Sequence, residues 1–139
     1  MFDRCLYFNV NTLARTVNKK WAKAFEQYDI SPAHGYMLRV VLSNPGVSQK
    51  QLANELRLEK STITRFVDAL EKKGFVVRKR GSTEDARELS IYATEKAKAI
   101  HAELEELGDS LYQSMVSKIG AANLKQLVGM LRESAKKIE

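Results

Sequence analysis

Apolar residues recur every three or four positions along most of the chain, which is the period of an amphipathic α-helix. The first such stretch is long, and its apolar positions are Leu6, Val10, Leu13, Val17, Trp21, Ala24 and Tyr28. A second helix is predicted in "SPAHGYML", where Ser31 can cap the N-terminus and Pro32 suits the first position, since its missing N–H costs nothing there. The "NPG" at 44–46 is expected to end this helix.

Two short helices in tandem are predicted within "VSQKQLANELRLEKSTITRFVDALEKKGFV". Ser48 and Gln51, three residues apart, form a capping box for the first of them. This helix is expected to bury Leu52, Ala53 and Leu56. The inward face of the second follows the i, i+3, i+4, i+7 spacing of Ile63, Phe66, Val67 and Leu70. Gly74 then stands where a left-handed C-terminal cap belongs.

The spacing of apolar residues changes after this helix. Two short runs of β-favouring residues, "FVVRKR" and "RELSIYAT", flank "GSTEDA" and predict a β-hairpin. Thr94 is expected to cap one further helix, whose apolar positions are Ala97, Ile100, Leu104, Leu107, Leu111 and Met115. A break near Gly120 precedes a last helix with Leu124, Leu127, Leu131, Ala135 and Ile138. The predicted order is four helices, a hairpin and two helices.

Charge is distributed unevenly along the chain. The net charge is +6 over 139 residues, a length that suits one domain. Residues 60–80 hold seven cations against two carboxylates, a net +5, whereas residues 101–139 come to −1. A basic segment within a neutral or acidic scaffold is the electrostatic footprint of a nucleic-acid-binding element.

Several classes of protein are disfavoured by the composition. No stretch approaches the roughly 20 apolar residues of a membrane span, so no membrane partner is expected. "MFDRCLYFNV" lacks the pattern of a secretory signal. With Cys5 as its one cysteine, the chain can form no intrachain disulfide, and a cytoplasmic location is expected.

The outward face of the second tandem helix carries hydroxyl groups and a cation. Its residues are Ser61, Thr62, Thr64, Arg65 and Asp68. Ser61 and Thr62 lie in the first turn after Lys60, where backbone N–H groups and the helix dipole favour a phosphate. Arg65 can reach a guanine edge with two hydrogen bonds, which discriminates between bases by about 1–3 kcal/mol. These features predict a DNA-binding helix-turn-helix; the alternative is a helical hairpin within an all-α bundle.

The predicted hairpin extends this basic surface, because a hairpin directly after a helix-turn-helix is the wing of a winged helix. The cations that run toward its tip, and are expected to contact the DNA backbone, are Arg78, Lys79 and Arg80. Asp85 would repel a phosphate, so its expected role is to pair with Arg87, two residues on, and aim it at a narrow minor groove. The alternative is a solvated loop whose charges have no role.

Taken together, these motifs resemble the MarR family of transcriptional regulators over essentially the whole chain. The wing motif of the family matches Asp85-Ala86-Arg87, and "STITRFVDALEKKGFV" is close to its recognition helix. The resemblance implies a mainly α fold with a small β-hairpin wing (α+β). It implies a winged helix-turn-helix at 31–94 and helical dimerisation regions at 1–29 and 95–139. The apolar stripes of the first and the last two predicted helices favour a dimer independently, since they would otherwise stay exposed.

The resemblance further implies a homodimer on a pseudo-palindromic DNA operator, repression, and in many members release by a small aromatic or phenolic ligand. The family's ligand pocket lies between the dimerisation helices and the winged domain. The candidate lining residues are Trp21, Phe25, Tyr28, His34, Tyr36 and Met37. The alternative for each of these side chains is ordinary core packing.

Redox sensing by cysteine is an alternative within the same family. When the first helix is aligned through Arg15 and "DIS", however, Tyr7 takes the position of the family's sensing cysteine, and Cys5 lies two residues earlier. Two residues turn a helix by about 200°, so Cys5 would face the wrong side. Trp21 also replaces the tyrosine partner of that cysteine.

No constellation typical of an enzyme is present. Hydrolysis needs a nucleophile, a base and an orienting group, and metal catalysis needs clustered ligands. His34 and His101 are far apart, and His101 has no second ligand at a clear spacing, so we expect neither a metal nor a cofactor. A winged helix that binds protein rather than DNA remains an alternative, which the +5 segment disfavours.

Overall fold

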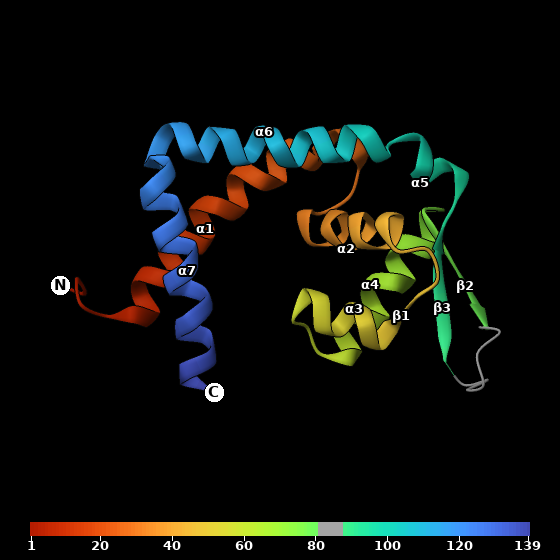
Figure 1. Cartoon of the computed structure of the whole chain (residues 1–139), viewed down its shortest axis with the longest axis horizontal. Helices are drawn as coiled ribbons and strands as arrows, with labels where there is room; N and C mark the ends of the chain where they lie inside the picture. The colour runs from red at the N-terminus through yellow and green to blue at the C-terminus, as the bar shows by residue number, and fades with distance from the viewer. Residues whose placement is uncertain (81–87) are drawn as a thin grey trace. The chain divides into compact units, whose positions relative to one another are not determined.

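The computed structural model describes residues 1–80 and 88–139 (Figure 1). The helices are α1 (Leu6–Phe25), the 3-10 turn η1 (Glu26–Tyr28), α2 (Pro32–Ser43), α3 (Gln49–Leu56), α4 (Lys60–Lys72), α5 (Glu95–Ala99), α6 (His101–Ile119) and α7 (Ala121–Ile138). The strands are β1 (Val47–Ser48), β2 (Val76–Arg80) and β3 (Leu89–Ala93). The predicted fold class, mainly α with a small antiparallel hairpin, is confirmed. The chain divides into two units, Met1–Leu104 and Glu105–Glu139.

Several local signals in the sequence are confirmed at the ends of helices. The side chain of Ser31 accepts a hydrogen bond from the backbone N–H of His34 at 3.2 Å and caps α2. Ser48 and Gln51 form both bonds of the predicted capping box on α3, at 3.1 and 2.9 Å. Gly74 follows α4 with a φ of +80°, a left-handed conformation that glycine adopts without steric cost. These signals mark the starts of α2 and α3 and the end of α4.

The sheet has one strand more than the sequence predicted. Its order is β1-β3-β2, and both neighbouring pairs are antiparallel. In β1, Val47 pairs with Ile91 and Ser48 with Ser90, so β3 is the central strand. A strand of two residues is too short to show alternation, and it forms because the turn after α2 returns the chain along β3.

Two predicted helix boundaries are wrong. The helix expected to run from Thr94 through Met115 is divided at Ile100, whose φ of −104° and ψ of 5° end α5. Ala97 and Leu104 are both fully buried on either side of this break, so the seven-residue spacing continues across it and conceals it. The first helix also ends earlier than expected, at Phe25, and Tyr28 lies in η1.

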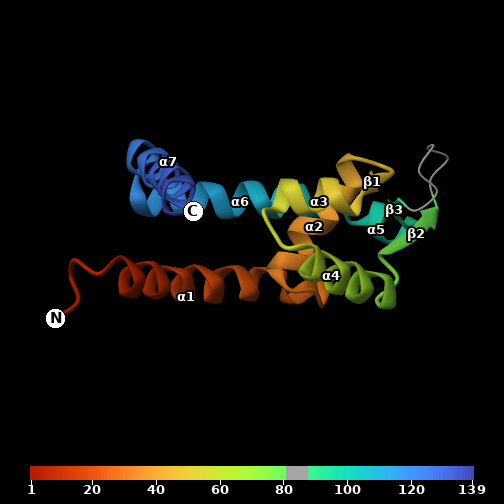
Figure 2. The ribbon, with the colours of Figure 1, turned by 90° about the horizontal axis from the view of Figure 1, so that it is seen from below.

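The core of the first unit fixes the orientation of α4. Figure 1 shows α2, α3 and α4 gathered beside the three strands, and Figure 2 shows the chain turning back from the end of α4 into β2. The buried apolar side chains of this unit are Phe25, Ile30, Met37, Leu38, Val41, Val47, Leu52, Ile63, Val67, Leu70, Phe75, Val76, Ile91, Ala97 and Leu104. Of the side chains that α3 was expected to bury, Leu52 is buried, whereas Ala53 and Leu56 are half-buried.

In the second unit, Gly120, with a φ of +94°, separates α6 from α7 as the sequence predicted. The apolar stripe of α7 is not covered: Leu124 and Leu127 are half-buried, and no residue of this helix is buried. Its most exposed large apolar residues are Val128, Met130, Leu131 and Ile138. None of the helices within 1–80 and 88–139 combines the length and the hydropathy that a membrane span requires.

Candidate nucleic-acid interface

The inner face of α4 determines which of its residues face solvent. Ile63, Val67 and Leu70 are fully buried in the core of the first unit. As predicted, the opposite side of the helix is accessible: its exposed residues are Ser61, Thr64, Arg65 and Asp68, and Thr62 is half-buried. Lys60, the first residue of the helix, is exposed as well. The N-terminal half of α4 therefore presents hydroxyl groups and two cations to solvent.

Within this face, Arg65 is held loosely by its own helix. Its Nη2 lies 3.4 Å from the hydroxyl of Thr62, one turn earlier, and the guanidinium is otherwise accessible. Two N–H groups of a guanidinium can be donated together to a guanine edge or a phosphate. The arrangement leaves Arg65 able to make such a contact.

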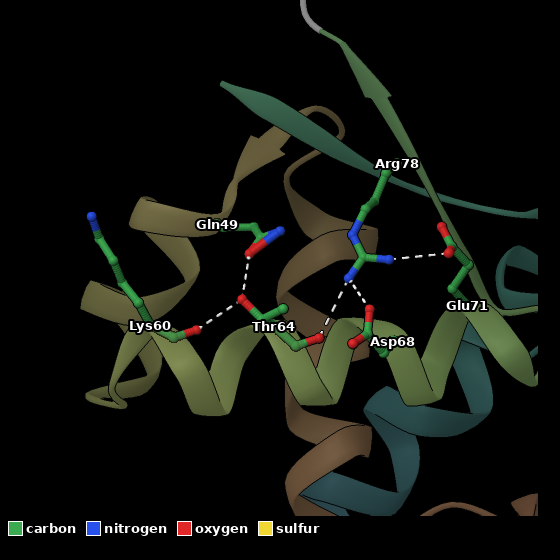
Figure 3. Close-up of polar contacts among 6 residues, drawn as sticks. All are labelled: Gln49, Lys60, Thr64, Asp68, Glu71 and Arg78. Carbon is green, nitrogen blue, oxygen red and sulfur yellow. Dashed lines mark hydrogen bonds and ion pairs between the residues drawn. The ribbon is translucent and has the colours of Figure 1, made fainter. Parts of the chain in front are cut away.

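A contact between α3 and α4, shown in Figure 3, was not predicted from the sequence. The hydroxyl of Thr64 lies 3.2 Å from Oε1 of Gln49 and 3.0 Å from the carbonyl oxygen of Lys60. One hydroxyl proton can be donated to one of these acceptors at a time, so the two bonds compete. A groove of about 280 Å³ beside this contact is lined by Gln49, Lys50, Lys60, Thr64, Glu88 and Leu89. Gln49 was missed because its position depends on how α3 packs on α4, which no local pattern reveals.

Strand β2 divides its three cations between two faces, because successive side chains of a strand point to opposite faces. Val76, Arg78 and Arg80 share one face, and Val77 and Lys79 the other. The ammonium of Lys79 lies 5.2 Å from the ring centroid of Tyr92 on β3, and the side chains of Lys79 and Arg80 are exposed.

Arg78 is engaged by α4. Its side chain is 17% exposed, and its guanidinium forms ion pairs with Asp68 and with Glu71 (Figure 3). The sequence indicated a contact with the DNA backbone and gave no sign of these partners. Asp85 and Arg87, the two charged residues of the predicted wing motif, lie outside the described residues.

The residues proposed to line a ligand pocket lie in and beside the core. Phe25 and Met37 are fully buried, whereas Trp21, Tyr28 and His34 are half-buried. Tyr36 is 37% exposed, and its hydroxyl accepts a hydrogen bond from the indole N–H of Trp21 at 3.1 Å. These contacts make Phe25 and Met37 part of the hydrophobic core, with Trp21 and Tyr36 paired at its edge.

Titratable groups in the described part of the chain are scattered. Within 1–80 and 88–139, no three His, Cys, Asp or Glu side chains are grouped closely enough to hold a metal ion. Cys5 is half-exposed at the position before α1 and forms no disulfide. The pKa of His34 is lowered from its ordinary value of 6.5 by burial and, to a smaller extent, by the charge of Lys73.

Comparison with known proteins matches the middle of the chain to a family model. Residues 30–89 match the model of the MarR family. Over 133 residues the chain is 27% identical to the HTH-type transcriptional regulator SarZ of Staphylococcus aureus, an alignment that covers 96% of this chain and 86% of SarZ.

Solved structures show the same fold. The S. aureus MepR protein, solved in complex with DNA, matches with a TM-score of 0.84 at 19% identity, over 95% of this chain and 96% of that one. The transcriptional repressor CouR, bound to a 23-mer DNA duplex, matches with a TM-score of 0.84 at 24% identity, over 96% and 94% of the two chains. At these identities the similarity establishes the fold, which agrees with the winged helix predicted from the sequence.

Proposed function

The chain belongs to the MarR family, through its domain at residues 30–89, and from this premise we propose that it binds double-stranded DNA and regulates transcription. The family consists of transcription regulators, not enzymes. The observation that carries the proposal is the exposed face of α4, where Lys60, Ser61, Thr64 and Arg65 stand on a helix anchored from its other side. Two similar structures, of MepR and CouR, contain DNA, which supports the same partner here.

Each part of this surface has a proposed role. The hydroxyls of Ser61 and Thr62, with the N–H groups of the first turn of α4, take a phosphate, and Lys60 adds a positive charge. Thr64 and Arg65 lie further along the helix, and Arg65 reads a base edge in the major groove. The exposed Lys79 and Arg80 contact the backbone beside it. Arg87, oriented by Asp85, completes the wing.

We propose further that the protein acts as a homodimer on a pseudo-palindromic operator. Exposed apolar residues on α1 support this, since a surface of this kind is typical of a protein interface. They are Leu6, Tyr7, Phe8, Val10 and Leu13. The exposed stripe of α7 supports it in the same way. A two-fold dimer places its recognition helices about 34–36 Å apart, one turn of DNA.

We also propose that the protein is a cytoplasmic repressor, and that a small aromatic or phenolic ligand releases it from DNA. Its support is the aromatic pair of Trp21 and Tyr36, which stays partly accessible at the edge of the core. The other candidate lining residues are Phe25, Tyr28, His34 and Met37. Of these, Phe25 and Met37 are buried in the core. A ligand with an aromatic ring and one polar group suits such surroundings.

Selection of bound duplexes from a random pool tests the proposal. The selected sites should be pseudo-palindromic, and binding should weaken with salt by about 0.9 log units per log unit of salt for each neutralised phosphate. Sedimentation should show a dimer. Repeating the binding with benzoate and with hydrogen peroxide separates an aromatic effector from redox sensing at Cys5.

A charge-matched pair of variants sharpens this test. Arg65→Glu reverses a charge on the proposed face, and Lys23→Glu reverses an exposed charge near the end of α1. Arg65→Glu should abolish selection, whereas Lys23→Glu should select the wild-type sites. Equal losses of DNA binding in both variants would show that binding depends only on the net charge of the protein. If the wild-type protein selects no duplex, a winged helix that binds protein is the better interpretation.

A further inference from the structure

Arg78 is the one cation of β2 that α4 holds. Its Nη1 lies 3.0 Å from Oε1 of Glu71, and its Nη2 forms an ion pair with Asp68. The same Nη2 lies 3.4 Å from the carbonyl oxygen of Thr64. With 17% of its side chain exposed, Arg78 has most of its donors directed at the helix rather than at solvent.

We infer that Arg78 is a positioning residue that acts on DNA binding through α4: it holds β2 against this helix and partly neutralises the charges of Asp68 and Glu71. This inference rests on the proposed function, because it assigns a role within the same DNA-binding surface. It differs from the expectation that Arg78 contacts a phosphate, since the two carboxylates already occupy its guanidinium.

The spacing of the partners explains how one side chain joins two elements. Thr64, Asp68 and Glu71 follow the i, i+4, i+7 pattern, so they form a single stripe along α4. Arg78 shares a strand face with Val76, which is 1% exposed in the core. The next residue on that face therefore emerges just beyond the core, over the helix. The planar fork of an arginine suits two carboxylates one turn apart, which the single ammonium of a lysine cannot match.

The charges explain why this matters for DNA. Asp68 stands on the exposed side of α4, one turn after Thr64 and Arg65, and Glu71 follows one turn later. Two uncompensated carboxylates there would repel phosphates approaching the same helix. Together with Arg78, the two carboxylates carry a net charge of −1, whereas without it they carry −2.

Affinity for the selected duplex, measured over a cycle of variants, tests the inference. Arg78→Ala should weaken binding about tenfold, because removing one partner of a charge pair leaves the others uncompensated. Adding Asp68→Asn and Glu71→Gln to Arg78→Ala should restore affinity to within about threefold of the Asp68→Asn/Glu71→Gln protein. Lys79→Ala, which removes a cation from the other face of the same strand, is the matched control and should show no such restoration with these substitutions.

A direct phosphate contact by Arg78 gives a different result. The two carboxamide substitutions would then change affinity equally with and without Arg78, and additivity of this kind would overturn the inference. Wild-type affinity in Arg78→Ala would overturn it as well. If Arg78→Ala does not fold, Arg78→Lys replaces it: a direct contact by charge would survive in that variant, whereas the loss of one carboxylate partner should weaken binding.

Failure of the inference can be told from failure of the proposed function. A wild-type protein that selects no duplex contradicts the proposed function. If the wild-type protein binds DNA but the Arg78→Ala/Asp68→Asn/Glu71→Gln protein binds no better than Arg78→Ala, the role inferred for Arg78 is wrong and the proposed function stands. Urea unfolding of the same variants without DNA measures the ion pairs themselves: the effects of Arg78→Ala and of Asp68→Asn/Glu71→Gln on the free energy of unfolding should not be additive.

Discussion

The imidazole of His34 on α2 meets the ring of Phe66 on α4 edge to face, with the two ring centroids 4.6 Å apart and an interplanar angle of 66°. His34 is also the residue whose backbone N–H is donated to the helix cap, Ser31. The His34 side chain thus lies between the first turn of α2 and the inner side of α4. Because the contact is half-buried and Lys73 is near, the charged form of the imidazole is disfavoured in the folded protein.

The first prediction is a loss of stability in mild acid. The pKa of His34 is lowered in the folded state from its ordinary value of 6.5, by burial first and by Lys73 second. As the pH falls below 6.5, the unfolded chain binds a proton at this residue before the folded chain does, so the unfolded state is favoured. The contribution of neutral His34 to the free energy of unfolding should be complete above the pKa of the unfolded chain. It should be lost as the pH falls from that value through the pKa of the folded protein.

Urea unfolding at a series of pH values measures this effect. His34→Gln should flatten the curve in the window just below pH 6.5, and Lys73→Met should move the folded pKa of His34 back toward its ordinary value. An NMR titration of the His34 ring in the wild-type protein and in Lys73→Met follows that pKa directly. A His34 ring that titrates above 6.5 in the folded protein would contradict the prediction.

The second prediction contrasts two glycines in helices. A methyl group added at Gly35 in α2 would lie 2.3 Å from Cε1 of Phe25, whereas one added at Gly129 in α7 would meet nothing within 4 Å. Alanine is favoured over glycine within a helix by about 1 kcal/mol, so Gly129→Ala should stabilise the protein by about that amount or less. Gly35→Ala should instead lower the free energy of unfolding by roughly 1–3 kcal/mol, because the ring of Phe25 is fully buried and must move. Thermal or urea unfolding of both variants tests this, and a stabilised Gly35→Ala would show that the contact relaxes without cost.

The third prediction concerns the capping box of α3. Ser48 is 5% exposed, and its hydroxyl accepts the N–H of Gln51 at 3.1 Å. Ser48→Ala should lower the free energy of unfolding by about 1–2 kcal/mol, since it removes a helix cap at a buried position. Ser43→Ala, at the exposed last residue of α2, is the control and should change it by less than about 0.5 kcal/mol. Equal effects of the two substitutions would contradict the role of the cap.

What could be predicted from the sequence was local. Ser31, Ser48 and Gly74 mark helix ends through bonds or dihedral angles set within a few residues, and each is confirmed. The buried stripe of α4 follows from periodicity in the same way. The break at Ile100 was missed because a change in the dihedral angles of one residue leaves the apolar spacing intact.

What was missed depends on contacts between elements. The partners of Arg78 lie on helix α4, ten and seven positions earlier in the chain, and they meet Arg78 because β2 packs on this helix. Gln49 meets Thr64 across fifteen positions because α3 packs on α4. From the sequence, "RKR" is three equivalent cations; in the fold, the alternation of β2 separates Lys79 from Arg78 and Arg80, and Arg78 is the one that pairs with α4.

The last prediction concerns base specificity. Arg65 is exposed on α4, one turn beyond the first-turn hydroxyls, and its nearest partner is the hydroxyl of Thr62 at 3.4 Å. If it reads a guanine with two hydrogen bonds, Arg65→Ala should weaken binding to the selected duplex by about 1–3 kcal/mol and relax the preference at one position of each half-site. Repeating the selection with the variant measures both effects.

Two further variants separate base reading from simple attraction to phosphate. Arg65→Lys keeps the charge but loses the two-pronged fork, so a base-reading Arg65 should still lose its preference in that variant. Lys72→Ala removes an exposed cation from the last turn of α4, two turns from Arg65 and on nearly the same side of the helix. It should leave the selected sequence unchanged. If Arg65→Ala weakens all duplexes equally and lowers the salt slope by about 0.9, then Arg65 contacts a phosphate, and base recognition must come from another residue on this surface.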